Sequence, residues 1–156
     1  MIEIDIPGKG VYRFEHLVLD LNGTISLDGA VIEGVSERLE LLRRQVDIVI
    51  VTADTQGKAQ ALGEDLRVEI HILHPGDEQE QKLRLVRQLG SEVTVSIGNG
   101  SNDAAMLKES GLGICMLGPE GASSETMANS DLVISDINAA LDLLLKPGRL
   151  IATLRR

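Results

Sequence analysis

The sequence predicts an α/β protein built on a doubly wound parallel β-sheet with flanking helices. Short apolar runs rich in Val and Ile recur along the chain, and segments with apolar residues at helical spacing lie between them. Strands that are apolar throughout are typical of a sheet covered on both faces. Regular alternation of strands and helices is typical of parallel strands joined by crossover connections.

Six apolar runs are predicted strands of this sheet. They cover residues 17–21, 47–51, 68–73, 93–97, 113–117 and 132–134. Between them, helices are predicted from two stripes of apolar residues at helical spacing, over 35–46 and over 83–89, the second ending at Gly90. A last helix is expected to begin at Asp136, a good N-cap residue, and to end before Pro147.

Two segments depart from this alternation and are predicted β-hairpins. In residues 1–15, isoleucines alternate with polar residues ahead of a Pro-Gly-Lys-Gly turn, which predicts a hairpin added to the edge of the sheet. In residues 25–32, Asp28-Gly29 separates two short β-prone arms just after the first long strand. We expect this second hairpin to form a small flap over a site at the end of that strand. At 156 residues the chain is expected to form one domain, 1–156, with the N-terminal hairpin in 1–15 and the core in 16–156.

Composition argues against several kinds of partner. The formal charge of −9 and the aromatic content of 1% make nucleic acid an unlikely ligand, because affinity for phosphate backbones needs clustered positive charge and stacking needs aromatic rings. No run approaches the length of a membrane span, and the first ten residues do not have the pattern of a secretion signal. We therefore expect a cytoplasmic protein without a membrane partner.

Polar residues follow three of the predicted strands. Asp20 ends the first long strand, Thr52-Ala53-Asp54 follows the second, and Gly98-Asn99-Gly100-Ser101-Asn102-Asp103 follows the fourth. Lys82 lies on the predicted helix ahead of that fourth strand. Open α/β sheets bind ligands at the carboxyl ends of their strands, so these residues are expected to meet at one site.

In this order the segments resemble the four motifs of the haloacid dehalogenase (HAD)-like hydrolase superfamily. Asp20-Leu21-Asn22-Gly23-Thr24, Thr52-Ala53-Asp54 and 102–107 look most like the phosphorylation domain of P-type ATPases. The resemblance spans 17–107 and implies a Rossmann-like HAD fold. Because no long insertion separates the motifs, it also implies a soluble relative of the pump domain without a large cap domain.

The resemblance, together with the chemistry of the side chains, gives each residue a role. Asp20 is the expected nucleophile, because a carboxylate accepts a phosphoryl group when cations neutralise the incoming oxygens. Thr52 and Lys82 are expected to bind the phosphoryl oxygens, the first by its hydroxyl and the second by its charge. Backbone or side-chain groups of Gly23, Ala53 and Asn102 complete the expected phosphate site.

A Mg²⁺ ion is the expected cofactor. The resemblance places it on Asp20, on the backbone carbonyl of Asn22, on Asn99 and on Asp103. Oxygen ligands of this kind suit a hard divalent cation. Asp103 is expected at the start of a helix, where the positive end of the helix dipole stabilises its charge.

Two positions differ from the superfamily pattern. Phosphatases of the superfamily usually carry a second Asp where this chain has Asn22, and that Asp protonates the leaving group and later activates water. An amide does neither, which predicts slow turnover that favours substrates with good leaving groups. Asn99 stands where a metal-binding Asp is usual, so one negative charge near the cation is lost. The alternative hypothesis is therefore a catalytically weak phosphate-binding, regulatory or scaffold protein that keeps the fold.

The predicted site is compatible with more than one substrate class. A small phosphorylated molecule and a phosphoprotein are both compatible with a site that lacks a cap, and a homo-oligomer could use a neighbouring subunit as the lid. A response-regulator receiver is disfavoured, because its acidic pair should close the first strand and its phospho-acceptor a central one. A dinucleotide site is disfavoured because Gly98-Asn99-Gly100 has Asp103 where a third glycine is needed.

Overall fold

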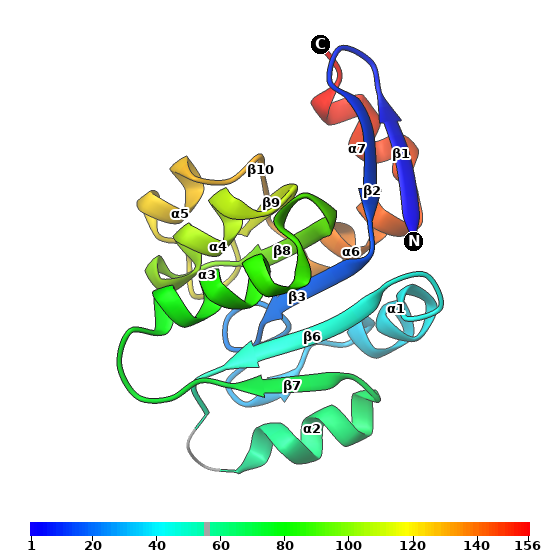
Figure 1. Ribbon diagram of the computed structural model, residues 1–156. Coiled ribbons are helices and arrows are strands. Elements are labelled where there is room, and N and C mark those ends of the chain that lie inside the picture. The colour runs from blue at the N-terminus through cyan, green and yellow to red at the C-terminus, as the bar shows by residue number, and fades with distance from the viewer. Residues whose placement is uncertain (55–56) are drawn as a thin grey trace.

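The centre of the molecule is a six-stranded sheet whose strands all run parallel. The computed structural model describes residues 1–54 and 57–156, and Figure 1 shows helices on both faces of the sheet. The strand order is β10–β9–β8–β3–β6–β7. The predicted doubly wound α/β fold is thus confirmed. Its strands are β3 (His16–Asp20), β6 (Asp47–Thr52), β7 (Glu69–Ile72), β8 (Thr94–Gly98), β9 (Leu112–Met116) and β10 (Leu132–Ile134).

The direction in which strands are added reverses at β3. From β3 the chain builds outward through β6 and β7, then returns to the other side of β3 and continues through β8, β9 and β10. Asp20 pairs with Val51 of β6, and Leu19 pairs with Ile97 of β8, so the carboxyl ends of these three strands lie together. Such a reversal point leaves a crevice where α/β sheets bind ligands.

Each face of the sheet has its own hydrophobic cluster. Leu17 and Leu19 of β3 belong to the first cluster, with residues of three covering helices, while Val18 belongs to the second. Burial on both faces explains why β3 is apolar from Leu17 to Leu19. The first face is covered by α1 (Val35–Leu42), α2 (Lys58–Leu66) and α6 (Ile137–Leu145), and the second by α3 (Glu78–Leu89) and α4 (Ala104–Glu109). Two short 3₁₀ turns, η1 (Ser91–Val93) and η2 (Ser101–Asp103), precede β8 and α4.

The N-terminal hairpin forms as predicted, but its expected place at the edge of the main sheet is wrong. β1 (Ile2–Ile6) and β2 (Gly10–Phe14) pair antiparallel in a separate two-stranded sheet. Figure 1 shows this hairpin beyond the start of β3, beside the C-terminal helix α7 (Pro147–Leu154). Ile2, Ile4 and Ile6 are buried in the same cluster as Leu150 and Leu154 of α7. The apolar face of the hairpin is therefore covered by a helix rather than by pairing with a strand.

A second small hairpin lies just after Asp20, as predicted for the flap. β4 (Ser26–Leu27) and β5 (Ala30–Val31) pair antiparallel. Asp28 and Gly29 connect them with positive φ angles of 51° and 82°, the conformation that a two-residue hairpin turn needs. Apart from this flap, the described residues between β3 and β8 belong to the sheet, its covering helices and their connections. The expectation of no large cap domain is confirmed for that part of the chain.

The C-terminal region contains two helices. Asp136 caps α6, because its Oδ1 accepts a hydrogen bond of 2.7 Å from the backbone N–H of Ala139, and α6 ends before Pro147, as predicted. The expectation that this helix is the last one is wrong, because Pro147 begins α7, where its missing N–H costs nothing. Among the described residues, no helix is long and apolar enough to cross a membrane.

Candidate active site

Asp20 lies at the carboxyl end of the central strand β3, where the strand order reverses. Its side chain is 13% exposed. One carboxylate oxygen, Oδ1, accepts a hydrogen bond of 2.9 Å from Lys82 Nζ, and the other, Oδ2, lies 3.2 Å from the hydroxyl of Thr24. The carboxylate is therefore held in place yet remains at the surface of a cavity.

Lys82 is buried between two carboxylates. It lies on α3, and its ammonium group is 2.9 Å from Asp20 Oδ1 and 2.6 Å from Asp103 Oδ1. Asp103 is itself fully buried, and its Oδ2 accepts the backbone N–H groups of Asn99 and Gly100, each at 3.0 Å. Asp103 thus fixes both the Lys82 ammonium and the loop that follows β8.

The ionisable pair is charged near neutral pH. The pKa of Asp20 is raised to about 6, chiefly by burial and to a lesser extent by the Asp103 carboxylate, while Lys82 opposes the shift. Burial lowers the pKa of Lys82, but the carboxylates of Asp20 and Asp103 outweigh it, so this pKa lies above its usual value. An ionised Asp20 beside a protonated Lys82 is the charge state that a phosphoryl acceptor requires.

Thr52 is the last residue of β6 and is buried beside the end of β3. Its Oγ1 accepts a hydrogen bond of 3.2 Å from the backbone N–H of Asp54, and a hydroxyl that accepts one bond can still donate its own proton. Asp54 in turn accepts the backbone N–H of Ala59 at 2.8 Å, in the first turn of α2. Asp54 therefore contributes to the start of that helix.

The loop after Asp20 is closed by backbone hydrogen bonds. Gly23 has a φ of +77°, and its N–H donates to the carbonyl of Ser26 at 2.8 Å. A Cβ at position 23 would overlap Glu120 Oε2 and would lie 2.7 Å from Asn99 Nδ2, so glycine is needed for space as well as for conformation. Asn22, next to it, is exposed, and its Oδ1 lies 3.4 Å from the hydroxyl of Ser26.

Two asparagines from the loop after β8 complete the site. Asn99 is 9% exposed, and its Oδ1 lies 3.3 Å from the Thr24 hydroxyl. Asn102 Oδ1 lies 3.4 Å from Lys82 Nζ, and Asn102 Nδ2 donates to Glu78 Oε2 at 2.8 Å. Glu78 is in the first turn of α3. The loop thus places one amide near Asp20 and another near Lys82.

These residues surround a cavity of about 310 Å³ at the carboxyl ends of the strands. Seven predicted site residues line it, whereas Gly23 and Asp103 do not. The Gly23 N–H is used inside its own loop and Asp103 is enclosed behind Lys82, so direct contact of either with phosphate or metal stays a prediction. The lining residues are Asp20, Asn22, Thr52, Ala53, Glu78, Lys82, Asn99, Gly100, Asn102 and Glu120.

The sequence prediction missed Glu78 and Glu120 in the lining, and Thr24 behind it. Thr24 is the last residue of the motif Asp20-Leu21-Asn22-Gly23-Thr24 and could have been found from that position. Glu78 lies four residues before Lys82, one helical turn away, and that spacing is a usable signal. Glu120 lies in a Gly-Pro-Glu-Gly turn, which the sequence alone indicates only as a turn.

The donors around the cavity fit a hard divalent cation. Asp20 and Asn99 offer side-chain oxygens, and both line the cavity together with Asn22. Among the described residues, no group of three His, Cys, Asp or Glu side chains is placed to hold a metal ion. A cation here would therefore depend on a mixture of carboxylate, amide and backbone oxygens, which Mg²⁺ accepts.

A second cavity, of about 450 Å³, adjoins the first through Asn22. It lies between the flap and α2. Its walls combine apolar residues with Lys58, Asp54 and Asp65. The lining residues are Leu21, Asn22, Ser26, Gly29, Asp54, Lys58, Ala59, Ala61, Leu62 and Asp65.

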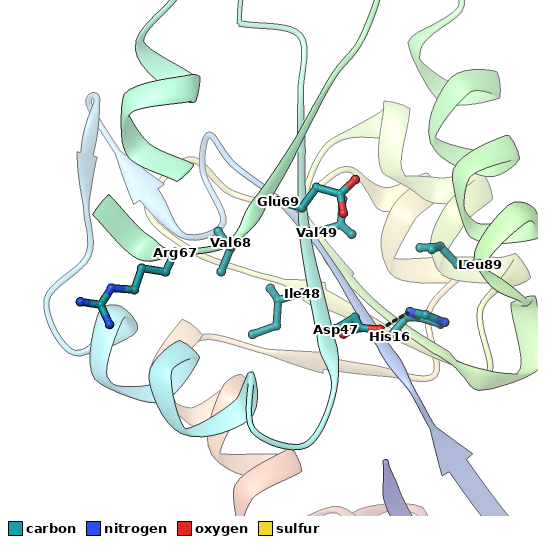
Figure 2. Close-up of a pocket in the computed structure, with 8 residues that line it drawn as sticks. All are labelled: His16, Asp47, Ile48, Val49, Arg67, Val68, Glu69 and Leu89. Carbon is teal, nitrogen blue, oxygen red and sulfur yellow. Dashed lines mark ion pairs between the residues drawn. The ribbon is translucent and has the colours of Figure 1, made fainter. Parts of the chain in front are cut away.

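A third cavity, of about 320 Å³, lies at the opposite end of the sheet, where β3 and β6 begin. Figure 2 shows that its polar groups do not converge, because the guanidinium of Arg67 points away from His16 and Asp47. The His16 Nδ1 to Asp47 Oδ2 distance is 3.9 Å, too long for a hydrogen bond. The first cavity is therefore the candidate active site.

Known sequences resemble this chain over much of its length. A family model described as haloacid dehalogenase-like hydrolase matches residues 4–111. An uncharacterized protein of Methanocaldococcus jannaschii is 49% identical over 84 residues, which cover 51% of this chain and 90% of that protein. A soluble P-type ATPase-like phosphatase of the same organism is 28% identical over 126 residues, covering 79% of this chain but 46% of that protein. Transporting ATPases also match, and the chain spans only 6% to 17% of those.

Among solved structures, the fold resembles a 3-deoxy-D-manno-octulosonate 8-phosphate phosphatase of Moraxella catarrhalis. The TM-score is 0.69, with 21% sequence identity, over 91% of this chain and 94% of that one. That phosphatase was solved in complex with a magnesium ion, a phosphate ion and a KDO molecule. At this identity the likeness concerns the fold.

Proposed function

The chain belongs to the haloacid dehalogenase-like hydrolase family, and from that premise we propose that it is a Mg²⁺-dependent phosphatase acting through a phosphoaspartate on Asp20. The observation that carries the proposal is the position of Asp20. Its carboxylate lies at the strand-order reversal, faces a cavity, and is held by the buried ammonium of Lys82 at 2.9 Å. The relation to a P-type ATPase-like phosphatase gives further support.

The lining residues can bind the phosphoryl group around this acceptor. Lys82 provides a fixed positive charge, and Thr52 can donate its hydroxyl proton to a phosphoryl oxygen. Asn102 lies within reach of the same ammonium, and Ala53 lines the cavity beside Thr52. Because these groups are held by other contacts before a substrate arrives, little reorganisation is needed when charge develops.

The reaction has two displacements. A carboxylate oxygen of Asp20 attacks phosphorus, and the bond from phosphorus to the substrate oxygen breaks, so the leaving group takes that electron pair. Water then attacks phosphorus, the bond to Asp20 breaks, and inorganic phosphate and the free carboxylate result. Both steps benefit from proton transfer, and the Asn22 amide cannot provide it. Slow turnover and a preference for good leaving groups, such as acyl or aryl phosphates, follow from this.

The proposed ligands of Mg²⁺ are the side chains of Asp20 and Asn99 and the backbone carbonyl of Asn22. Asp103, the fourth predicted ligand, lies behind Lys82 and does not line the cavity. When bound, the cation neutralises the phosphoryl oxygens and the acceptor carboxylate. The oxygen-rich cavity supports this assignment, as does the magnesium-bound phosphatase with the same fold.

The leaving group of the substrate would occupy the cavity between the flap and α2. That cavity shares Asn22 with the cavity of about 310 Å³ that Asp20 lines, here called the acceptor cavity. Its own volume of about 450 Å³ suits a small organic group. A small phosphorylated molecule is therefore the substrate class that we propose. A phosphorylated side chain on an exposed protein loop could enter the same space.

Trapping of the phosphoenzyme tests this function. The protein is mixed with ³²P-labelled acetyl phosphate and Mg²⁺, quenched in acid, and analysed for bound label in the wild type and in Asp20→Asn. We expect Mg²⁺-dependent label in the wild type that hydroxylamine releases, and none in the variant. Labelling equal in both would refute the assignment of Asp20. Phosphate binding without label or turnover would instead favour a phosphate-binding or regulatory role, for which the neutral Asn22 is the supporting observation.

A further inference from the structure

Glu120 brings a carboxylate into the acceptor cavity from a part of the chain outside the motifs. It follows β9 in the turn Gly118-Pro119-Glu120-Gly121, which is closed by a 2.8 Å hydrogen bond from the Gly121 N–H to the Gly118 carbonyl. Proline at the second position fixes the direction of this turn. Glu120 is an exposed residue, yet it lines the same cavity as Asp20.

The Glu120 turn and the segment after it are tied to the loop that carries Asn99. Asn99 Nδ2 donates to the Gly121 carbonyl at 3.4 Å, and the Asn99 carbonyl accepts the Ser123 N–H at 2.9 Å. The hydroxyl of Thr126, in α5 (Ser124–Ala128), donates to the Gly100 carbonyl at 2.6 Å. The position of Glu120 is thus coupled to the loop that carries Asn99 of the proposed Mg²⁺ site.

The Glu120 carboxylate and the Asn99 amide lie against the same face of Gly23. A Cβ at Gly23 would overlap Glu120 Oε2 and would lie 2.7 Å from Asn99 Nδ2. Within the described part of the chain, the Glu120 carboxylate has no hydrogen-bond or ion-pair partner. An unpartnered carboxylate beside a neutral amide, in a cavity with another carboxylate at Asp20, is suited to bind a cation.

We propose that Glu120 is a ligand of the divalent cation and supplies the negative charge that Asn99 lacks. This inference rests on the Mg²⁺ site of the proposed function. Glu78, the other glutamate at the cavity, is a poorer candidate, because its Oε2 already accepts a hydrogen bond of 2.8 Å from the amide of Asn102 on the Lys82 side. In this chain the charge near the cation comes from the turn after β9, and the loop after β8 contributes an amide.

Mg²⁺ titration of the full chain without substrate tests the inference. Isothermal calorimetry should show that Glu120→Gln weakens Mg²⁺ binding by about 10-fold or more, the effect expected from removing a group that supports a metal site. Glu125→Gln is the matched control, because it removes the same charge from an exposed position nearby that does not line the cavity. It should bind Mg²⁺ like the wild type. Unchanged affinity in Glu120→Gln, or an equal loss in the control, would overturn the inference.

Asn99→Asp provides a second, independent readout. Alone it should tighten Mg²⁺ binding, and combined with Glu120→Gln it should return the affinity to near the wild-type value, since one carboxylate replaces the other. A double variant that stays as weak as Glu120→Gln would contradict a shared cation, because the new carboxylate at position 99 would then not compensate for the one lost at position 120. Thermal unfolding in EDTA checks that all variants fold.

The phosphoenzyme assay distinguishes failure of the inference about Glu120 from failure of the proposed function. If the wild type forms Asp20-dependent label at saturating Mg²⁺ but Glu120→Gln binds Mg²⁺ normally, the inference about Glu120 fails and the phosphatase stands. If Glu120→Gln loses Mg²⁺ affinity but no label forms on Asp20, the cation site stands and the phosphatase fails. A wild type that binds no Mg²⁺ overturns the inference directly.

Discussion

Asn22→Asp tests the chemistry of the site most directly. Asn22 is exposed and lines both the acceptor cavity and the neighbouring cavity, so a substitution there disturbs no core packing. Asn and Asp are nearly isosteric, and the oxygen that lies 3.4 Å from the Ser26 hydroxyl is kept. The change therefore adds a group able to transfer protons beside the acceptor and alters little else.

Two opposing effects set the expected size of the gain. General acid–base assistance is worth about 10²- to 10⁴-fold. The added charge would raise the pKa of Asp20, which burial already holds at about 6. Even a further rise of about one unit would lower the ionised fraction near pH 7.5 by less than about twofold. We therefore expect turnover of alkyl phosphates to rise by about 10- to 1000-fold, with the lower part of this range allowing for imperfect geometry.

Steady-state kinetics on an alkyl phosphate and acid-quench trapping measure the two consequences. The Asn22→Asp variant should turn over faster and retain less labelled phosphoenzyme than the wild type, because water attack on the phosphoaspartate is also accelerated. The gain should vanish when Asp20→Asn is added. A variant no faster than the wild type, or a gain that persists without Asp20, would refute the reasoning.

Three further changes probe the surroundings of the site. Gly23→Ala should destabilise the fold by about 1–2 kcal/mol, because the φ of Gly23 is +77°. It should also weaken Mg²⁺ binding, because the added Cβ would displace Glu120. An unchanged midpoint of chemical denaturation and an unchanged Mg²⁺ affinity would contradict this. Ala61→Phe narrows the cavity beside α2 and should raise the KM for p-nitrophenyl phosphate about 10-fold, with little effect on the KM for acetyl phosphate. The control Gln60→Phe, on the same helix but outside the cavity, should change neither KM. Asp142→Asn removes a carboxylate whose pKa is held below its usual value chiefly by an arginine hydrogen bond, and should cost about 2 kcal/mol at pH 7. Because that contribution is lost as pH falls through the lowered pKa, the difference in urea unfolding should shrink below about pH 4, and a constant difference would exclude this origin.

The fold was largely predictable because its strands are buried on both faces. The strand predicted over 132–134 is β10, and the end of β3 at Asp20 was evident from the change to polar residues. The helix α2 was missed, since Gly63 in its middle lowers helix propensity. In the structure a Cβ at Gly63 would overlap Ile70 Cγ1, so glycine allows the helix to approach β7. That requirement exists only once the two segments are packed together.

The predicted place of the N-terminal hairpin failed for a related reason. Alternating Ile2, Ile4 and Ile6 indicate a strand with one buried face, but they do not identify what buries it. The structure places them against α7, a helix that is absent from the elements predicted from the sequence. In the site, the strand-end residues Asp20 and Thr52 were found by position, since each directly follows an apolar run. Glu120 was not, because only the hydrogen bonds between its turn and the Asn99 loop bring it to the cavity.

The charges at the acceptor cavity explain why both asparagines can be tolerated there. Among the described residues that line it, Asp20, Glu78 and Glu120 carry negative charge and Lys82 carries positive charge. A phosphate dianion would therefore meet a negative surface, and at about 4 Å each like-charge contact near a protein surface costs about 4 kcal/mol before screening. Carboxylates at positions 22 and 99 would add to that repulsion before a cation is bound. On the proposed assignment, the amides of Asn22 and Asn99 limit the repulsion of phosphate, and Glu120 provides a carboxylate ligand for the cation from an exposed turn. Phosphate and Mg²⁺ should therefore bind as a pair.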